Sequence, residues 1–389
     1  MISVAEALDQ LFELAHPLGV ETIPLVETVG RVLAEDVRAT RDQPPFDSSA
    51  MDGYAVTQAT PGDVFRVVGE SAAGHRFDGP VGDGEAVRIF TGAPVPEGTR
   101  RIVIQEDVTR DGDKITATGD LGGNTHIRPA GGDFGVGDTV AAGRIIGPND
   151  IALMASMSIP DVPVTRRPRV ALISTGDELV MPGETPNADQ IIASNTLGLH
   201  ALMRVLGAEP RLLPIAKDNE PSLRTALEMA RGADLIVTIG GASVGDHDVV
   251  ANLAPKLGMT QSFYKVAMRP GKPLMAGRFG DAMMIGLPGN PVSAMVCGHV
   301  FVAPVIRAML GLPAQATPRS HAPLAADLTP NGPREHYMRA RMTPDGLVAF
   351  GAQDSSLLSI LNEADALIVC APLDPARSKG DTVQYIPIR

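Results

Sequence analysis

A glycine-rich loop carries the first concentration of residues whose types and spacing could bind a ligand. It follows residues 235–239, a β-branched apolar run that is typical of a buried strand. The loop supplies two glycines, a hydroxyl and two carboxylates: Gly240, Gly241, Ser243, Asp246 and Asp248. Glycines let the backbone approach a ligand closely, and consecutive N–H groups at a strand end bind anions. Taken alone, the loop is equally well explained as a turn, so its interpretation depends on its neighbours.

Two further loops of the same region carry opposite charges. Asp177 and Glu178 follow an apolar run at residues 170–174, which is also typical of a strand. Farther along, a short segment concentrates three bases in a protein of net charge −12: Lys265, Arg269 and Lys272. Carboxylates suit a hard divalent cation such as Mg²⁺, and these bases suit an oxyanion or a phosphate. One acid at a strand end more often forms a turn, whereas three such loops on one sheet edge indicate a binding site.

A helix start completes this group of residues. Pro288 closes a strand-like run, and Asn290 and Pro291 are typical of an N-cap and a first helical turn. A helix N-terminus beside a glycine turn binds anions readily. The residue types and their spacing therefore predict a binder of a phosphorylated or oxyanionic ligand, together with Mg²⁺.

The elements that must position these residues follow a strand–turn–helix pattern from residue 169 onward, which predicts a parallel sheet. Before it, residues 57–140 alternate short β-patterned runs with turns, and a proline-containing stretch at 160–168 is expected to be a linker. A capping-box pattern at residues 3–6 predicts a first helix. After residue 313 the pattern returns to β, which predicts a C-terminal barrel or sandwich.

The N-terminal half contains three loops with polar residues of its own. They carry Asp52, Thr91 and Asp133. The loop with Asp52 combines prolines, serines and an Asp-Gly step before a β-like run, which is explained either as a structured turn or as a functional loop. In the functional interpretation, Asp47 and Asp52 project into a shared cleft.

Composition and motif searches exclude several classes of protein. The net charge of −12 argues against nucleic-acid binding, which normally needs a basic face. The two cysteines, Cys297 and Cys370, are far apart, which indicates a reducing compartment without a disulfide framework. The sequence lacks HExxH, GxGxxG and GxxxxGK[ST] patterns. No signal peptide is evident, and polar interruptions in the apolar stretch at 292–312 favour a buried helix, so we expect a soluble cytoplasmic protein.

Six motifs together resemble one family. PPFDSSAMDGYAV, FTGAPVP, STGDEL, GGASVGDHD, AMRPGKP and LPGNPVSA occur in the order found in the molybdopterin molybdenumtransferases, the MoeA proteins, whose eukaryotic relatives include the gephyrin E domain. Each motif alone is weak, but six in order are specific. The resemblance runs from the first predicted helix to the C-terminal β region.

The resemblance implies a multidomain α/β and β protein that acts as a homodimer. Its parts would be an elongated helical and extended domain (1–45 and 138–168), an inserted β domain (46–137), a molybdopterin-binding α/β domain with a parallel-type sheet (169–313) and a C-terminal β barrel (314–389). The site would lie between the α/β domain of one subunit and the inserted domain of the other. The implied reaction inserts molybdate into adenylylated molybdopterin and releases AMP with Mg²⁺, forming the molybdenum cofactor.

The same resemblance implies roles for the residues that match the motifs. Asp177 and Glu178 are expected near Mg²⁺ or the leaving AMP, and both are expected to be catalytic. The positions expected to bind the pterin substrate are Gly240, Gly241, Ser243, Asp246, Asp248, Pro288 and Pro291. Arg269 and Lys272 are expected to hold molybdate, with Arg339 and Ser355 from the C-terminal domain. Lys265, in the same basic loop, is expected to bind substrate. Asp52, Thr91 and Asp133 are also expected to be catalytic, completing the site from the partner subunit.

Three positions depart from the family pattern. Arg269 stands where many relatives have Lys, which keeps the charge but changes the donor geometry toward an oxyanion. Ser48 replaces a common Asn, and Ala193 replaces an acid often found before Ser-Asn, so no ligand role is assigned to Ala193.

Two other functions remain open at this stage. One is a gephyrin-like scaffold that has kept the fold but lost the chemistry, against which the retained acids and basic loop argue. The other is the adenylyltransferase of the preceding step, against which the residues before 169 argue, since they carry the FDSSAMDGYA motif. The adenylyltransferase and molybdoenzyme apoproteins are also possible partners of the enzyme, whereas nucleic acid and membranes are not expected.

Overall fold

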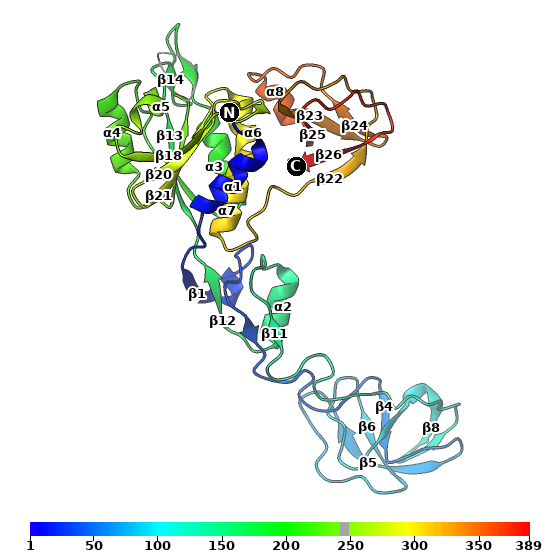
Figure 1. Cartoon of the computed structure of the whole chain (residues 1–389). Coiled ribbons are helices and arrows are strands. Elements are labelled where there is room, and N and C mark those ends of the chain that lie inside the picture. Colours follow the sequence, from blue (N-terminus) through cyan, green and yellow to red (C-terminus); the bar gives the residue numbers. More distant parts are fainter. Residues whose placement is uncertain (242–248) are drawn as a thin grey trace. The chain divides into compact units, whose positions relative to one another are not determined.

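The computed structural model of the chain describes residues 1–241 and 249–389. The chain divides into two compact units (Figure 1). The first comprises residues 1–21, 30–34 and 164–389, and the second comprises residues 22–29 and 35–163. Two of the four unit boundaries fall within strands, one in β1 (Val20–Pro24) and one in β12 (Asp161–Thr165). The stretch expected to be a linker therefore contains a strand.

The first unit is built around a six-stranded mixed sheet. Its strand order is β16 (Glu209–Leu212), β13 (Arg169–Ser174), β17 (Leu235–Ile239), β21 (Ala282–Leu287), β20 (Met275–Phe279) and β18 (Met259–Tyr264). The first four strands are parallel, as the sequence pattern predicts. The expectation of a wholly parallel sheet is wrong at one edge, because β20 and β18 run antiparallel. Only Gly280 and Asp281 separate β20 from β21, and a two-residue loop makes a hairpin but cannot carry a crossover.

Helices cover both faces of this sheet (Figure 1). One face packs on α1 (Val4–Leu14), α3 (Asn195–Val205), α6 (Pro291–Cys297) and α7 (Ala303–Met309), and the other packs on α4 (Glu220–Met229) and α5 (Val249–Leu253). Successive residues of β13 alternate between the two cores, Leu172 on one side and Ile173 on the other. Strands that are buried on both faces need apolar side chains at consecutive positions, which explains their nearly continuous apolar runs.

Two sequence predictions about helices are confirmed. Ser3 caps α1, because its hydroxyl accepts the N–H of Glu6 at 3.2 Å while its own N–H donates to the Glu6 carboxylate at 2.7 Å. The long apolar stretch forms one helix over residues 291–309, in which α6 and α7 flank a π-helical turn, η3 (Gly298–Val302). Among the described residues, this helix alone is long and apolar enough to span a membrane, but 83% of it is buried inside the protein.

The C-terminal part of the first unit is a second sheet. Its order is β19 (Met268–Arg269), β23 (Glu335–Thr343), β25 (Ala366–Cys370), β26 (Thr382–Pro387) and β22 (Ser320–Pro323), with β24 (Gly346–Ala349) on β23 and a short helix, α8 (Leu358–Glu363). A single bridge joins Leu324, just after β22, to Leu347 in β24. Closure of this sheet into the expected barrel remains a prediction.

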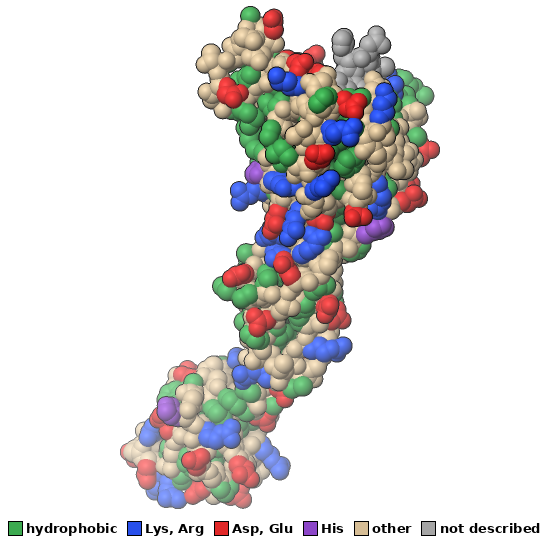
Figure 2. All heavy atoms as spheres, turned by 90° about the vertical axis from the view of Figure 1, so that its left-hand side faces the viewer, with side chains coloured by type: hydrophobic (Ala, Val, Ile, Leu, Met, Phe, Trp, Pro, Cys, Tyr) green, Lys and Arg blue, Asp and Glu red, His purple; other side chains and the backbone are tan. Residues whose placement is uncertain are grey.

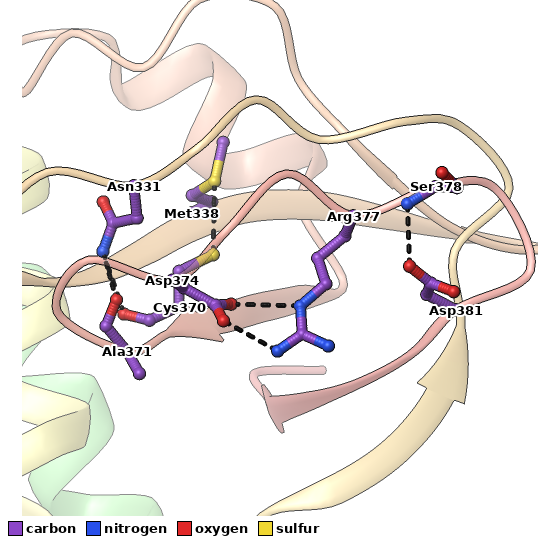
Figure 3. Close-up of polar contacts among 8 residues, drawn as sticks. All are labelled: Asn331, Met338, Cys370, Ala371, Asp374, Arg377, Ser378 and Asp381. Carbon is purple, nitrogen blue, oxygen red and sulfur yellow. Dashed lines mark hydrogen bonds and ion pairs between the residues drawn. The ribbon is translucent and has the colours of Figure 1, made fainter.

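Side-chain hydrogen bonds fix the connections of this second sheet (Figure 3). The amide of Asn331 donates to the carbonyl oxygens of Arg334 and Ala371 at 2.9 and 2.7 Å, which ties the segment before β23 to the end of β25. Asp374 and Arg377 form an ion pair at 2.7 Å within the loop that follows. A different segment of this part, between β24 and α8, reaches the site described below.

The second unit contains a six-stranded sheet. Its order is β7 (Arg101–Ile104), β4 (Gly53–Val56), β6 (Glu85–Ile89), β5 (Val64–Ser71), β9 (Lys114–Ala117) and β8 (Val108–Asp111). Smaller elements are β2 (Val37–Arg38) with β11 (Thr139–Val140), β3 (Ser48–Ser49) with β10 (Ile127–Arg128), the single-turn helices η1 (Leu25–Glu27) and η2 (Gln105–Asp107), and α2 (Pro148–Ser156). The predicted β character of residues 57–140 is confirmed.

Candidate functional site

A cavity of about 630 Å³ opens at the carboxyl ends of the parallel strands of the first unit. Five of the residues expected to be catalytic or to bind substrate line it: Glu178, Gly240, Gly241, Pro288 and Pro291. Other lining residues include Thr175, Ser194, Asn195, Asp218, Pro273, Asn290 and Ser356. Ligands of open α/β sheets bind at this edge, so the predicted location of the site agrees with the fold.

Backbone hydrogen bonds align the carboxyl ends of three strands, β13, β17 and β21, at the cavity. The N–H of Thr175 donates to the carbonyl of Ile239 at 2.9 Å, and the N–H of Gly240 donates to that of Leu287 at 3.1 Å. Gly240 and Gly241 have φ angles of +95° and +62°, which side chains rarely allow. A Cβ at Gly240 would lie 2.6 Å from the carbonyl oxygen of Thr175. Only glycine therefore permits this turn.

The two acids after β13 have different surroundings. Glu178 is exposed and lines the cavity, and its carboxylate lies so close to Gly176 that it would clash with a Cβ there. Asp177 accepts the N–H of Asp218 at 3.3 Å, which ties its loop to a second acidic residue of the cavity wall. Across residues 1–241 and 249–389, no group of three or more His, Cys, Asp or Glu side chains could hold a metal ion.

The start of α6 is fixed from two sides. The amide of Asn195 donates to the carbonyl of Gly289 at 2.6 Å, and the amide of Asn290 donates to the hydroxyl of Ser355 at 2.9 Å. The N–H of Val292 also donates to the carbonyl of Ser355 at 3.0 Å. Ser355 is the site residue predicted in the C-terminal domain. It therefore lies at the rim of the cavity, bonded to Asn290, which lines the cavity.

The basic loop borders the cavity through Pro273, which follows Lys272 directly. Arg269 and Lys272 are exposed, and the ammonium of Lys265 lies 4.6 Å from the centre of the Tyr264 ring. None of the three bases itself lines the cavity in the part of the chain that the structure describes.

The strand that carries Arg269 pairs with the C-terminal sheet, which places Arg269 opposite His336. Burial, followed by the charges of Arg269, Arg334 and Arg339, lowers the pKa of His336 to about 4. The imidazole is therefore neutral at pH 7, and the positive charge of this corner belongs to the arginines.

Arg339 is buried, with 1% of its surface exposed. Its Nε donates to the side-chain oxygen of Gln353 at 3.2 Å, and its Nη1 donates to the carbonyl of Leu357 at 3.3 Å. Burial lowers the pKa of Arg339, and the charge of Asp354 opposes that effect. Through these bonds Arg339 holds the segment that carries Ser355 to the cavity rim, while its predicted contact with molybdate stays a prediction.

The second unit holds its own polar cluster. Asp52 and Thr91 contact each other directly, and the guanidinium of Arg88 lies 5.1 Å from the ring of Tyr54 and 4.6 Å from that of Phe90. Asp133 is exposed. Asp47 accepts the N–H of Ala130 at 2.8 Å and ties down a neighbouring loop, while its place in a cleft shared with Asp52 stays a prediction.

Three predicted residues, Ser243, Asp246 and Asp248, lie outside the described residues. Others were missed. Asn195 and Thr175 both line the cavity, and the buried hydroxyl of Thr175 has no hydrogen-bond partner among the described residues. The sequence offered Thr175 only as part of the strand-end loop, and it offered no signal for Asn195 beyond its place at a helix start.

Acidic and basic side chains are interspersed over the face shown in Figure 2. The acidic side chains behind the net charge of −12 therefore form no single acidic patch on that face. A binding site for an anion on this chain must depend on local groups, such as the glycine turn and the basic loop beside the cavity.

Comparison with known proteins identifies the class to which this fold and cavity belong. Residues 2–158 match the MoeA N-terminal region (domain I and II), residues 171–308 match a probable molybdopterin binding domain, and residues 321–388 match the MoeA C-terminal region (domain IV). The chain belongs to the MoeA family.

Individual relatives agree with this assignment. A molybdopterin molybdenumtransferase from Nostoc sp. is 36% identical and covers 100% of this chain and 94% of its own length. A molybdopterin molybdenumtransferase from Haemophilus influenzae is 34% identical, with 100% and 98% covered. Among solved structures, a molybdopterin biosynthesis MoeA protein from Pyrococcus horikoshii superposes with a TM-score of 0.87 at 27% identity, covering 100% of this chain and 99% of the other.

Proposed function

We propose that this chain inserts molybdate into adenylylated molybdopterin, releasing AMP and forming the molybdenum cofactor. The observation that carries the proposal is the cavity at the strand ends, where the Gly240–Gly241 turn, Glu178 and the edge of the basic loop meet. A glycine turn suits a phosphate, and fixed cations beside it suit a tetrahedral oxyanion. The full-length similarity to molybdopterin molybdenumtransferases supports the same function.

In this proposal each group has one task. The glycine turn, the residues after it and the start of α6 hold the pterin substrate: Gly240, Gly241, Ser243, Asp246, Asp248, Pro288 and Pro291. Lys265, Arg269 and Lys272 raise the local concentration of molybdate and orient it toward the dithiolene sulfurs. Arg339 and Ser355 support that oxyanion site from the C-terminal sheet.

Mg²⁺ belongs to the proposal as well. The ion is commonly held by one or two carboxylates together with substrate phosphates. Glu178 at the cavity, with Asp177 beside it, fits that donor set. When bound, Mg²⁺ supplies a Lewis acid for the departing phosphate of AMP.

We further propose that the enzyme is a cytoplasmic homodimer with the four-part domain division described above, including a closed C-terminal barrel. Asp52, Thr91 and Asp133 would then complete the site of the other subunit. The adenylyltransferase and molybdoenzyme apoproteins are the proposed protein partners, since one supplies the substrate and the others accept the product.

The test is AMP release from adenylylated molybdopterin in Mg²⁺ buffer, with and without molybdate. We expect release that depends on molybdate. Tight binding without turnover would support the scaffold instead, and formation of adenylylated molybdopterin from ATP and molybdopterin would support the adenylyltransferase. Unchanged turnover in both Asp52→Ala and Glu178→Ala would show that the site lies elsewhere.

A further inference from the structure

Arg339 lies one residue beyond the end of the strand beside it. Its own strand, β23, pairs with β24 as far as Ala340, whose partner Ala349 is the last residue of β24. The side chain of Gln353 takes the place of the missing strand at Arg339. Its oxygen accepts the backbone N–H of Arg339 at 3.0 Å, and its nitrogen donates to the backbone carbonyl of Arg339 at 2.9 Å.

The same amide also fixes the side chain of Arg339. The oxygen of Gln353 accepts a second bond, from the Nε of Arg339 at 3.2 Å, and the nitrogen donates a second bond to the carbonyl of Phe350 at 2.9 Å. A side-chain amide has two N–H donors and an oxygen with two lone pairs, so these bonds use its whole capacity. An amide bonded on every side has one orientation, and it gives the guanidinium of Arg339 a fixed direction.

The fixed guanidinium lies next to the wall of the cavity. Its Nη1 donates to the carbonyl of Leu357 at 3.3 Å, and the preceding residue, Ser356, lines the cavity. Among the described residues, the bonds to Gln353 and Leu357 use two of the five N–H groups of the guanidinium. The others remain available to a ligand.

The bonds to Gln353 and Leu357 leave the charge of Arg339 unneutralised, because both acceptors are neutral. The charge of Asp354 acts on Arg339, but the Oδ1 of Asp354 accepts the N–H and the hydroxyl of Ser356. Other arginines of the C-terminal part form ion pairs with acids, namely Arg319 with Glu335, Arg341 with Glu363 and Arg377 with Asp374. A buried charge held only by neutral groups favours the binding of an anion that can neutralise it.

We infer that Gln353 is a positioning residue of the oxyanion site, which holds Arg339 in one direction without neutralising its charge. The inference rests on the proposed function, in which Arg339 supports the binding of molybdate. Molybdate carries two negative charges, so the charge of Arg339 attracts it about twice as strongly as a singly charged anion of the same shape. A neutral amide at position 353 therefore favours doubly charged tetrahedral oxyanions over singly charged ones.

The direct test titrates the protein with molybdate and with perrhenate, a tetrahedral oxyanion of charge −1, by calorimetry. Gln353→Glu keeps an acceptor for Arg339 but adds a negative charge. We expect its affinity to fall by about ten- to a hundredfold for molybdate and by about three- to tenfold for perrhenate. Gln353→Met removes the bonds without adding charge, so both anions should lose affinity by a similar factor of about ten.

A purely structural role for Gln353 would give different results. The second oxygen of Gln353→Glu would face the carbonyls of Arg339 and Phe350, so denaturant unfolding of both variants measures the stability that each loses. In the AMP release assay, Gln353→Met should raise the KM for molybdate and leave the KM for adenylylated molybdopterin unchanged. A loss of packing alone would lower stability without separating these two constants.

Gln384→Glu is the matched control. The oxygen of Gln384 accepts a bond from Arg319 at 3.2 Å in the same sheet, so this variant places the same new charge beside a different arginine. It should leave the affinities for molybdate and perrhenate unchanged.

Four results would overturn the inference. They are an unchanged molybdate affinity in Gln353→Glu, equal losses of molybdate and perrhenate affinity in that variant, a loss of stability alone in Gln353→Met, and no binding of either oxyanion to the unmodified protein. Failure of the proposed function has a different signature. The unmodified protein would then bind molybdate in this charge-dependent way but show no molybdate-dependent AMP release.

Discussion

Thr91 donates both its backbone N–H and its hydroxyl to one oxygen of Asp52, Oδ1, at 2.7 and 2.8 Å. These two bonds, the backbone bond first, lower the pKa of Asp52, and the charge of Arg88 lowers it further. Two motifs that lie far apart in the sequence thus form one anionic group of fixed orientation. The contact joins the FDSSAMDGYA and FTGAP motifs within the second unit.

The first prediction concerns the ionisation of Asp52. Thr91→Val keeps the backbone bond and removes the hydroxyl, so the pKa of Asp52 should rise part of the way to its ordinary value. A carboxylate with a lowered pKa stabilises the fold above its ordinary pKa and loses that contribution as pH falls through the lowered value. The acid limb of the stability profile should therefore move to higher pH in this variant.

Carboxyl NMR titration measures this shift. Thr57→Val is the matched control, since the Thr57 hydroxyl donates to Asp83 at 3.0 Å elsewhere in the same unit. It should leave the titration of Asp52 unaltered. An unchanged Asp52 titration in Thr91→Val would contradict the role given to that hydroxyl.

The second prediction tests the proposed sharing of the site between subunits. Asp52→Ala and Glu178→Ala should each reduce AMP release by at least about a hundredfold, the usual effect of losing a charge-stabilising group. When the two are unfolded together and reassembled in equal amounts, about a quarter of the sites should combine two intact halves in a twofold dimer. AMP release should recover to that level. The control reassembles each variant separately with unmodified protein. If these control mixtures regain activity but the mixture of the two variants does not, the site is confined to one chain.

The third prediction concerns an ion pair at the other end of the sheet. Arg166 donates to both oxygens of Asp234 at 2.8 and 2.6 Å, and the N–H of Arg169 adds a third bond at 2.8 Å. Burial alone would raise the pKa of Asp234, but the bonds from Arg166 and Arg169 outweigh it and lower the pKa. The pair therefore stabilises the fold above the ordinary pKa of Asp234, and this contribution disappears as pH falls through the lowered value.

Asp234→Asn should lower the free energy of unfolding by about 1–2 kcal/mol at pH 7, because the pair is partly exposed. The loss should shrink at acid pH, and kcat/KM should stay the same because Asp234 lies at the opposite end of β17 from the cavity. Denaturant unfolding at several pH values measures the effect. A loss of stability that does not vary with pH would mean that packing, not charge, is responsible.

The fourth prediction separates backbone strain from a steric clash at the glycine turn. Gly240 and Gly183 have nearly the same φ, +95° and +97°. A Cβ at Gly240 would clash with Thr175, whereas a Cβ at Gly183 would have no atom within 4 Å. Gly183→Ala should cost about 1–2 kcal/mol of stability and keep full AMP release. Gly240→Ala should cost more and also weaken substrate binding. If the two variants lose the same stability and bind substrate equally well, a clash with Thr175 is not the reason for glycine at position 240.

Much of the fold follows from local patterns. Ser3 and Glu6 form the capping box that their spacing predicts, and the apolar runs at β13, β17 and β21 form parallel neighbours. The antiparallel edge was missed because the two-residue Gly280–Asp281 turn was not recognised as a hairpin. The π-helical turn around His299 was also missed, since nothing in the local sequence distinguishes it from a regular helix.

The site could be predicted to the level of its loops but not of its contacts. Strand-end glycines and Glu178 reach the cavity because local sequence determines where a strand ends. The burial of Arg339 and the bond from Asn290 to Ser355 depend on how the C-terminal sheet packs against the start of α6, which no local pattern encodes. The same is true of the Thr175 hydroxyl, which has no hydrogen-bond partner among the residues that the structure describes.

The measurement that tests the central claim most directly follows AMP release and pterin-bound molybdenum in one reaction with adenylylated molybdopterin, molybdate and Mg²⁺. The proposed function predicts that both rise together in equal amounts, and that Glu178→Ala abolishes both. AMP release without transfer of molybdenum, or the same release in the absence of molybdate, would contradict it.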